Sequence, residues 1–179
     1  AALPEQPALF IYIPAITGTE VALIVKGLFQ GLADVAHHQG RALDTDFAAA
    51  ATSPPTPLLI VGGTRWDADA CSHITRFAER QQLPVVTSYR RLPLFDPLHP
   101  NYAGDLGIGP NPKLVSRIKA ADLLILAGGR LGEIASQGYS LLDIPSPASK
   151  LVHIYPDAME IGRVYAPALS INASPRRFA

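Results

Sequence analysis

Two glycine pairs are the strongest chemical signal in the sequence, because each directly follows a short apolar run. Gly62 and Gly63 follow Leu-Leu-Ile-Val, and Gly128 and Gly129 follow Leu-Leu-Ile-Leu-Ala. A continuous aliphatic run of this kind is typical of a parallel strand buried on both faces. Glycines at its carboxyl end let the chain turn tightly and let a ligand approach the backbone. The two pairs therefore predict a cleft at the carboxyl edge of a parallel sheet, suited to a nucleotide or to another domain.

Arg130 and Asp157 are charged residues that also follow strand-like runs. Arg130 comes directly after the second glycine pair, where a guanidinium could pair with a diphosphate or stack on an adenine. An ion pair with a nearby acid such as Glu133 is the alternative. Asp157 follows the apolar residues 151–155, where a carboxylate can accept hydrogen bonds from ribose hydroxyls. Its alternative role is to cap a helix that Glu160 completes in a capping box.

A third glycine-rich stretch runs from Gly107 to Pro112. It begins like the dinucleotide fingerprint G-x-G-x-x-G, but Pro112 stands where the third glycine belongs. Asn111 and Pro112 are typical of a helix cap and first turn, so the glycines precede the amino terminus of a helix. Backbone amides at that place could meet a phosphate. A loop that needs its glycines only for chain reversal is the alternative.

The sequence lacks the usual signatures of catalysis. It contains no nucleophile-elbow serine, no Walker loop and no helical His-Glu-x-x-His, and its five histidines lack ligand spacing. The single cysteine, Cys71, excludes an intramolecular disulfide and a cysteine zinc cluster. Cys71 lies in the apolar stripe of a predicted helix, which favours a buried structural thiol over a nucleophile. We therefore expect no catalytic and no metal-binding residue in this chain.

The composition indicates a folded protein without net charge. Of the 179 residues, 48% are hydrophobic and 17% are charged, which is enough for a core and argues against disorder. Fifteen basic and fifteen acidic residues cancel, so we expect no nucleic-acid and no anionic-membrane partner. No run reaches the roughly twenty apolar residues that span a bilayer, and the amino terminus lacks the order of a signal peptide. We expect a cytoplasmic protein that self-associates easily.

Alternating apolar runs and helical patterns predict an α/β fold: a doubly wound, mostly parallel Rossmann-like sheet of about six strands with helices on both faces. Residues 58–179 are expected to form this domain. Residues 1–57 are expected to hold a strand at 8–13, a helix from Thr17 to Gly40 and a proline-rich linker. The domain predictions are strands at 58–61, 84–87, 123–127, 151–155 and 169–171, helices at 67–82 and 111–120, an irregular stretch at 88–110, and a partly helical segment at 131–142.

In this order, the motifs resemble the central domain of thiamine-diphosphate-dependent enzymes, the family that contains acetolactate synthases, benzoylformate decarboxylases and pyruvate oxidases. The loop His99-Pro100-Asn101-Tyr102, followed by Gly104 and Leu106-Gly107, is similar to the family's His-Pro, aromatic, Gly and Leu-Gly loop. Asp157 with Glu160-Ile161-Gly162 is similar to its Asp-x-x-Glu-Ile-Gly turn. The other similar stretches are 59–63, 83–88 and 121–130, and the whole resemblance lies within residues 56–172.

The resemblance implies a division of labour within a larger parent enzyme. In the family, thiamine diphosphate and its Mg²⁺ are gripped by two other domains, one for the pyrimidine and one for the diphosphate. The chain would be a piece of such an enzyme. This piece would bind neither thiamine diphosphate nor Mg²⁺ and would have a structural and assembly role. Its partners would be those two domains of the same parent, in a homo-oligomer. The parent is expected to be a lyase or transferase, either a 2-oxo acid decarboxylase or an acetolactate-synthase-like carboligase.

In some relatives the central domain also holds FAD or ADP across the cleft at the carboxyl edge. Two stretches depart from the flavin-binding pattern: residues 131–134 are Leu-Gly-Glu-Ile where synthase-like flavin binders show Phe-Asp-Asp-Arg, and Asn172-Ala173 stands where the family has Gly-Asp. A free-standing module that binds FAD or NAD is the alternative to a domain of a thiamine enzyme. The residues that match the nucleotide site are Gly62, Gly63, Thr64, Gly107, Gly128, Gly129, Arg130 and Asp157.

Overall fold

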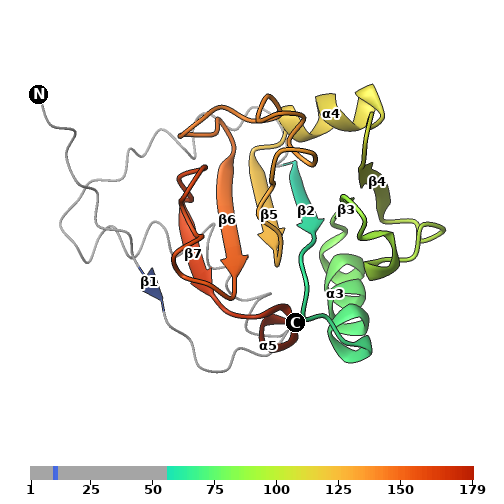
Figure 1. The fold of residues 1–179 in the computed structure, drawn as a ribbon. Helices are drawn as coiled ribbons and strands as arrows, with labels where there is room; N and C mark the ends of the chain where they lie inside the picture. Colours follow the sequence, from blue (N-terminus) through green and yellow to red (C-terminus); the bar gives the residue numbers. More distant parts are fainter. Residues whose placement is uncertain (1–9, 12–55) are drawn as a thin grey trace, which may run out of the picture.

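A computed structural model describes residues 10–11 and 56–179. They form a seven-stranded sheet in the order β1-β7-β6-β5-β2-β3-β4 (Figure 1), and every pairing is parallel. The strands are β1 (Phe10–Ile11), β2 (Pro57–Val61), β3 (Val85–Ser88), β4 (Tyr102–Leu106), β5 (Leu123–Ala127), β6 (Lys150–Tyr155) and β7 (Leu169–Asn172). The helices are α3 (Ala68–Gln81), α4 (Pro112–Lys119) and α5 (Pro175–Phe178), with one short 3-10 helix, η1 (Leu92–Leu94).

The strand order reverses beside β2, which lies in the middle of the sheet. After β2 the chain moves outward through β3 to β4, returns to the other side of β2 as β5, and moves outward again through β6 to β7. This is the order of dinucleotide-binding sheets, in which the reversal marks the place where ligands bind. We call the carboxyl ends of β2 and β5 the switch point. The predicted doubly wound parallel sheet is confirmed.

The amino-terminal predictions are described only in part. β1 lies within the strand expected at residues 8–13 and pairs with β7, with Phe10 opposite Ser170. β1 is therefore one of the about six strands that the sequence predicts, and the additional strand of the seven-stranded sheet is β4. The helix expected from Thr17 to Gly40 and residues 41–55 of the linker lie outside the described residues.

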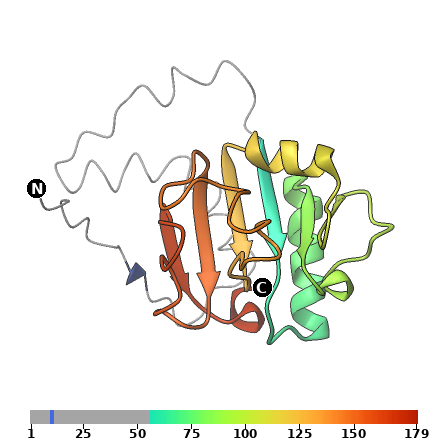
Figure 2. The ribbon, with the colours of Figure 1, turned by 45° about the horizontal axis from the view of Figure 1, so that its top comes forward.

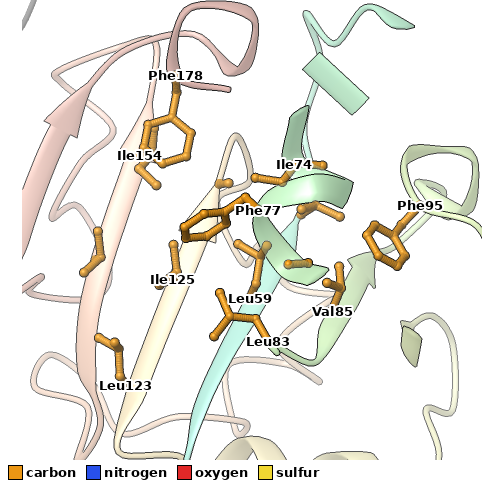
Figure 3. Close-up of a cluster of buried hydrophobic side chains, with 14 of the residues drawn as sticks. Leu59, Ile74, Phe77, Leu83, Val85, Phe95, Leu123, Ile125, Ile154 and Phe178 are labelled. Atoms are coloured by element: carbon orange, nitrogen blue, oxygen red, sulfur yellow. The ribbon is translucent and has the colours of Figure 1, made fainter. Parts of the chain in front are cut away.

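Alternate residues of the central strands face two separate cores, one on each side of the sheet. On one side Leu59 of β2 packs in a cluster with Phe77 of α3 and Phe178 of α5 (Figure 3). On the other side Leu58 packs in a cluster with Ile118 of α4. Each fully buried side chain of this kind stabilises the fold by about 1.5–3 kcal/mol. Helices therefore cover both faces of the sheet, as predicted.

The two longer helices begin at the caps that the sequence predicts. Asp67 Oδ1 accepts a hydrogen bond from the N–H of Ala70 (2.9 Å) at the start of α3. Asn111 Oδ1 accepts from the N–H of Lys113 (2.9 Å), and Pro112 is the first residue of α4. A side-chain acceptor at this position satisfies an amide that has no partner within the helix. The caps fix where α3 and α4 begin.

The stretch 88–110 was expected to be irregular, and this is wrong because it contains β4. This strand reads Tyr-Ala-Gly-Asp-Leu and lies at the edge of the sheet, where only Leu106 is fully buried. Its place in the sheet depends on pairing with β3 rather than on an apolar pattern of its own. The pairing is irregular, with a shift in register between Val85 and Val86, and Gly104 has a φ of 132°.

The segment 131–142 was expected to be partly helical, and the structure shows a series of turns instead. Its Ser136 Oγ donates to the carbonyl of Gly132 (3.0 Å) and accepts from the N–H of Tyr139 (3.0 Å), which closes these turns. A right-handed helix requires negative φ at every residue. Three non-glycine residues of the segment have positive φ, namely Leu131, Gln137 and Tyr139.

Candidate functional site

The structure brings the two glycine pairs together at the switch point. Gly62-Gly63 directly follows β2, Gly128-Gly129 directly follows β5, and these strands are neighbours. The N–H of Gly62 donates to the carbonyl of Ala127 (2.9 Å), and the N–H of Gly128 donates to the carbonyl of Ile154 (2.8 Å). The hydrogen-bond ladder therefore continues into both glycine turns. Two of the amides that could meet a phosphate are already donors within the sheet.

The two glycine turns touch backbone to backbone. A Cβ atom on Gly63 would lie 1.6 Å from the carbonyl oxygen of Gly128, and one on Gly62 would lie 3.3 Å from the Cα of Gly129. Gly63 and Gly128 also have φ of 71° and 74°, a conformation that residues with a Cβ rarely adopt. These glycines are needed for the packing of one turn against the other.

Two residues that the sequence did not single out, Trp66 and Pro175, cover the same place. Trp66 Nε1 donates to the carbonyl of Gly62 (2.8 Å). A Cβ atom on Gly128 would lie 3.3 Å from Trp66 Nε1 and 2.6 Å from Pro175 Cγ. Trp66 is the single tryptophan of the chain and closely follows the first glycine turn. This position could have indicated from the sequence that it belongs to the site. Pro175 carries no such signal, because its position depends on the packing of α5 against α3 and β6.

Arg130 is paired with an acid, as one of its two alternatives proposed, but the acid is Glu160 rather than Glu133. Arg130 donates to Glu160 Oε2 (3.2 Å), and Arg163 donates to Glu160 Oε1. The two guanidiniums, Arg163 first, hold the pKa of Glu160 below its usual range, while the hydrogen bond to Glu160 raises the pKa of Arg130. The Arg130 side chain remains 60% exposed, so its other donors face solvent.

Asp157 closes a turn after β6 and does not cap a helix. Its Oδ1 accepts from the N–H of Met159 (3.0 Å), and its carbonyl accepts from the N–H of Glu160 (3.2 Å). The following residues form turns, so the capping-box prediction is wrong. The acidic residue expected to complete the box is instead the partner of Arg130. The Asp157 side chain is exposed at the end of the strand next to β5.

Gly107 lies apart from the packed glycine turns, whereas Thr64 directly follows one of them. Gly107 follows β4, which is separated from β2 by β3. A Cβ atom on Gly107 would lie 2.6 Å from Asp105 Oδ2, so this loop holds a carboxylate beside its glycine. A carboxylate there disfavours a phosphate by like-charge repulsion. Thr64 follows the first glycine pair and is exposed.

His153 is a further residue of the site that sequence reasoning missed. It lies on β6, is 5% exposed, and its Nε2 is 2.9 Å from the carbonyl oxygen of Gly129. Since a carbonyl can only accept, Nε2 carries the proton and the imidazole is a donor to the second glycine turn. Burial lowers the pKa of His153, which favours this neutral form. A polar histidine within an otherwise aliphatic strand could have indicated from the sequence that His153 has a buried hydrogen-bond partner.

Cys71 is not poised as a nucleophile. It is half-buried on α3 rather than fully buried as predicted, and burial together with Asp67 raises the pKa of its thiol. A raised pKa leaves little reactive thiolate at neutral pH. Within residues 10–11 and 56–179, no group of three or more His, Cys, Asp or Glu side chains is placed to hold a metal ion. No helix in this part of the chain is long and apolar enough to cross a membrane.

Comparison with known protein families shows which family the chain belongs to. The family model described as "Thiamine pyrophosphate enzyme, central domain" matches residues 48–179. The chain belongs to this family. The resemblance drawn from the ordered motifs is thereby confirmed.

Curated relatives of this central domain are much longer proteins. A sulfoacetaldehyde acetyltransferase of Alcaligenes xylosoxydans xylosoxydans is 31% identical over 123 residues, which are 69% of the chain and 20% of the relative. An acetolactate synthase large subunit of Corynebacterium glutamicum is 32% identical over 108 residues, or 60% of the chain and 17% of the relative. One from Parasynechococcus marenigrum is 31% identical over 157 residues, or 86% and 23%. The chain thus spans about a fifth of the length of the relatives it matches.

In this central domain the His-Pro loop, on which the resemblance partly rested, has structural contacts. Asn101 Nδ2 donates to the carbonyls of Ala78 (3.2 Å) and Leu83 (2.9 Å), which ties the loop to the end of α3 and the start of β3. His99 Nε2 lies 3.1 Å from Glu79 Oε1 on α3. The loop therefore positions the edge strand β4 against the rest of the domain.

Proposed function

We propose that the chain supports the assembly of a thiamine-diphosphate-dependent parent enzyme and performs no catalytic step itself. The observation that carries this proposal is the packing of the two glycine turns against each other at the switch point. A Cβ atom on Gly63 would lie 1.6 Å from the carbonyl oxygen of Gly128, so the backbone there is engaged with itself. The glycines that would approach a ligand in a nucleotide-binding sheet instead hold the two turns rigidly against each other.

The parent enzyme joins or transfers acyl units from 2-oxo acids or related donors. This part of the proposal is supported by relatives named acetolactate synthase and sulfoacetaldehyde acetyltransferase. The runner-up class for the parent is a lyase that decarboxylates 2-oxo acids. Thiamine diphosphate and Mg²⁺ are bound by the pyrimidine- and diphosphate-binding domains of the same parent. The central domain holds these domains in place within a homo-oligomer.

A nucleotide site for FAD or ADP is the second candidate function. It would use the residues that match the family's nucleotide site, and one observation favours it. Arg130 and Asp157 follow the adjacent strands β5 and β6, and both side chains are exposed there. A guanidinium and a carboxylate at neighbouring strand ends suit a diphosphate and a ribose respectively.

Thermal unfolding of the chain with added ligands tests both functions. A ligand present at 100 times its dissociation constant adds about 2.7 kcal/mol to the free energy of unfolding if it binds only the folded state. The structural role predicts unchanged unfolding with FAD, ADP, NAD and with thiamine diphosphate plus Mg²⁺. Stabilisation by FAD or ADP would contradict the purely structural role and favour the second candidate, and stabilisation by thiamine diphosphate would contradict the proposed division between domains.

Two variants show whether a stabilising nucleotide uses the predicted site. Arg130→Ala removes the exposed guanidinium at the end of β5, and Arg117→Ala removes an exposed guanidinium from α4 as the matched control. A nucleotide bound at the carboxyl edge loses its stabilising effect in Arg130→Ala and keeps it in Arg117→Ala. Equal effects in both variants would mean that the nucleotide binds elsewhere.

A further inference from the structure

FAD and ADP are the groups that the fold family implies at the carboxyl edge, and the residues at the switch point show how well such a group fits. In dinucleotide-binding sheets the pyrophosphate lies at this reversal, against the backbone of a glycine turn and its free amides. A fit therefore requires space beside the glycines, amides that point into that space, and no oxygen already there.

The space beside Gly128 is filled by side chains of the chain itself. Its imagined Cβ would meet Pro175 Cγ at 2.6 Å and Trp66 Nε1 at 3.3 Å, so both groups lie against the same point of the second glycine turn. The indole N–H donates to the carbonyl of Gly62 (2.8 Å), and the ring packs against the core on the α3 side. The tryptophan thus bridges the two glycine turns.

Two backbone amides of the turns already have hydrogen-bond partners within the sheet. The N–H groups of Gly62 and Gly128 donate to carbonyls of β5 and β6. The carbonyl oxygen of Gly128 lies 1.6 Å from the Cβ position of Gly63, which places an electronegative atom where an anion would approach that glycine. A phosphate at this place would meet a carbonyl oxygen instead of a free donor.

Helix α5 holds Pro175 in position through two contacts with α3 and its cap. Phe178 is 3% exposed in the cluster that contains Phe77 (Figure 3). Arg176 Nε lies 2.8 Å from Asp67 Oδ2, and the other oxygen of Asp67 caps α3. Figures 1 and 2 both show α5 at the end of the sheet toward which β2, β5 and β6 point.

We infer that Trp66 and Pro175 form an internal plug that excludes nucleotides from the switch point. The plug takes the place of the ligand that this strand order normally holds there, and α5 keeps it seated. The inference rests on the proposed structural role and gives it a physical cause. Residues at the switch point do not fit FAD or ADP while α5 is docked.

Fluorescence of Trp66 reports on the plug directly, because it is the single tryptophan of the chain. Pro175→Ala removes the ring Cγ that lies against the same point of Gly128 as the indole Nε1, and the space it opens should shift the emission of Trp66 to the red and increase its quenching by acrylamide. Met159→Ala is the control, since Met159 is 84% exposed beyond the end of β6, and it should leave both unchanged. Identical emission and quenching in Pro175→Ala and the wild-type chain would overturn the inference.

A second variant keeps the test decisive if Pro175→Ala unfolds the domain. Arg176→Ala removes only the ion pair with Asp67, and its side chain is 76% exposed. The plug predicts a red shift in the same direction, because α5 loses one of its contacts. An unchanged emission in this folded variant would count against α5 as the element that seats the plug.

Titration with ADP separates failure of the plug from failure of the structural role. The plug predicts that ADP leaves the emission of Trp66 in the wild-type chain unchanged. A change of emission on binding would overturn the plug, because ADP would then reach the switch point. A rise in Tm with unchanged emission would contradict the structural role and leave the plug standing, since the nucleotide would bind away from Trp66. No change in either quantity supports both.

Discussion

The carbonyl oxygen of Gly128 lies 1.6 Å from the position that a Cβ atom on Gly63 would occupy. The two residues follow neighbouring strands, and neither turn can move away without breaking the hydrogen bonds that continue the ladder into the glycines. The contact therefore explains why residue 63 is a glycine: any side chain there would overlap the backbone of the neighbouring turn. Gly63 was predicted to meet a ligand, but in the structure it sets how closely the ends of β2 and β5 approach each other.

Gly63→Ala is expected to destabilise the domain severely. The added methyl group overlaps a backbone oxygen, and its φ of 71° is unfavourable for alanine. Strain and overlap together should lower the free energy of unfolding by about 3 kcal/mol or more. Urea denaturation measures the loss. Gly109→Ala is the matched control, because it has a φ of 76° but open space around its Cβ position, and an equal loss in both variants would show that the overlap contributes nothing.

Asn101→Asp is expected to destabilise the link between the His-Pro loop and α3. The amide donates to two carbonyls, whereas a carboxylate would place negative charge against the same oxygens. Loss of such donors costs about 1–3 kcal/mol, and more for a charged group. Unfolding at neutral pH measures the cost, which should shrink as the pH falls and the new carboxyl group becomes protonated.

Asn111→Asp provides the matched control for that substitution. Asn111 uses its side-chain oxygen as an acceptor at the start of α4, and an aspartate accepts equally well there. Its effect on the free energy of unfolding should therefore be small. Similar losses at positions 101 and 111 would mean that the donors of Asn101 do not hold the loop.

The sheet could be predicted from sequence because its central strands carry the signal locally. β5 is buried at all five residues, and a continuous aliphatic run requires no knowledge of its neighbours. β4 could not be predicted in this way, since Gly104 and Asp105 interrupt any apolar pattern and its pairing with β3 is a long-range contact. The turns at 131–142 were mistaken for helix because buried residues such as Leu131 and Leu141 mark a core-facing segment of either kind.

The candidate site could be located from sequence, but its contents could not. Strand ends that meet at one edge follow from parallel pairing, so the approach of the two glycine pairs was predictable. The partner of Arg130 lies 30 residues further along the chain, and only the adjacency of β5 and β6 brings it near. Pro175 reaches the switch point through a helix whose position depends on tertiary packing. These contacts have no local pattern.

His153 is expected to make stability fall as the pH drops below about 6.5. Burial lowers the pKa of the folded-state imidazole from its ordinary value of 6.5, so the unfolded chain binds the proton more readily. The contribution is fully present above that ordinary pKa and is lost as the pH falls toward the folded-state pKa. The slope reaches at most about 1.4 kcal/mol per pH unit for one proton. Urea denaturation across this pH range measures it.

His153→Gln tests the assignment of that slope. A glutamine carries no titratable group and still offers an N–H donor for the carbonyl of Gly129. The slope below pH 6.5 should therefore diminish in this variant and remain in His73→Gln, which alters an exposed histidine on α3. A slope that persists unchanged without His153 would assign the pH dependence to other groups.

Glu160 is expected to contribute stability at neutral pH that disappears in acid. Arg163 and Arg130 lower the pKa of its carboxyl group below the ordinary 4.5, so the folded state loses the proton more readily than the unfolded chain. The contribution is present above that ordinary value and is lost as the pH falls through the lowered pKa. Because both guanidiniums are largely exposed, the effect should be small and should weaken with added salt. Comparing Glu160→Gln with Glu133→Gln, which alters an exposed acid of the neighbouring segment, measures this contribution. The salt dependence of the free energy of unfolding should change in Glu160→Gln alone. Equal changes in both variants would mean that the pairing with the arginines does not act on stability.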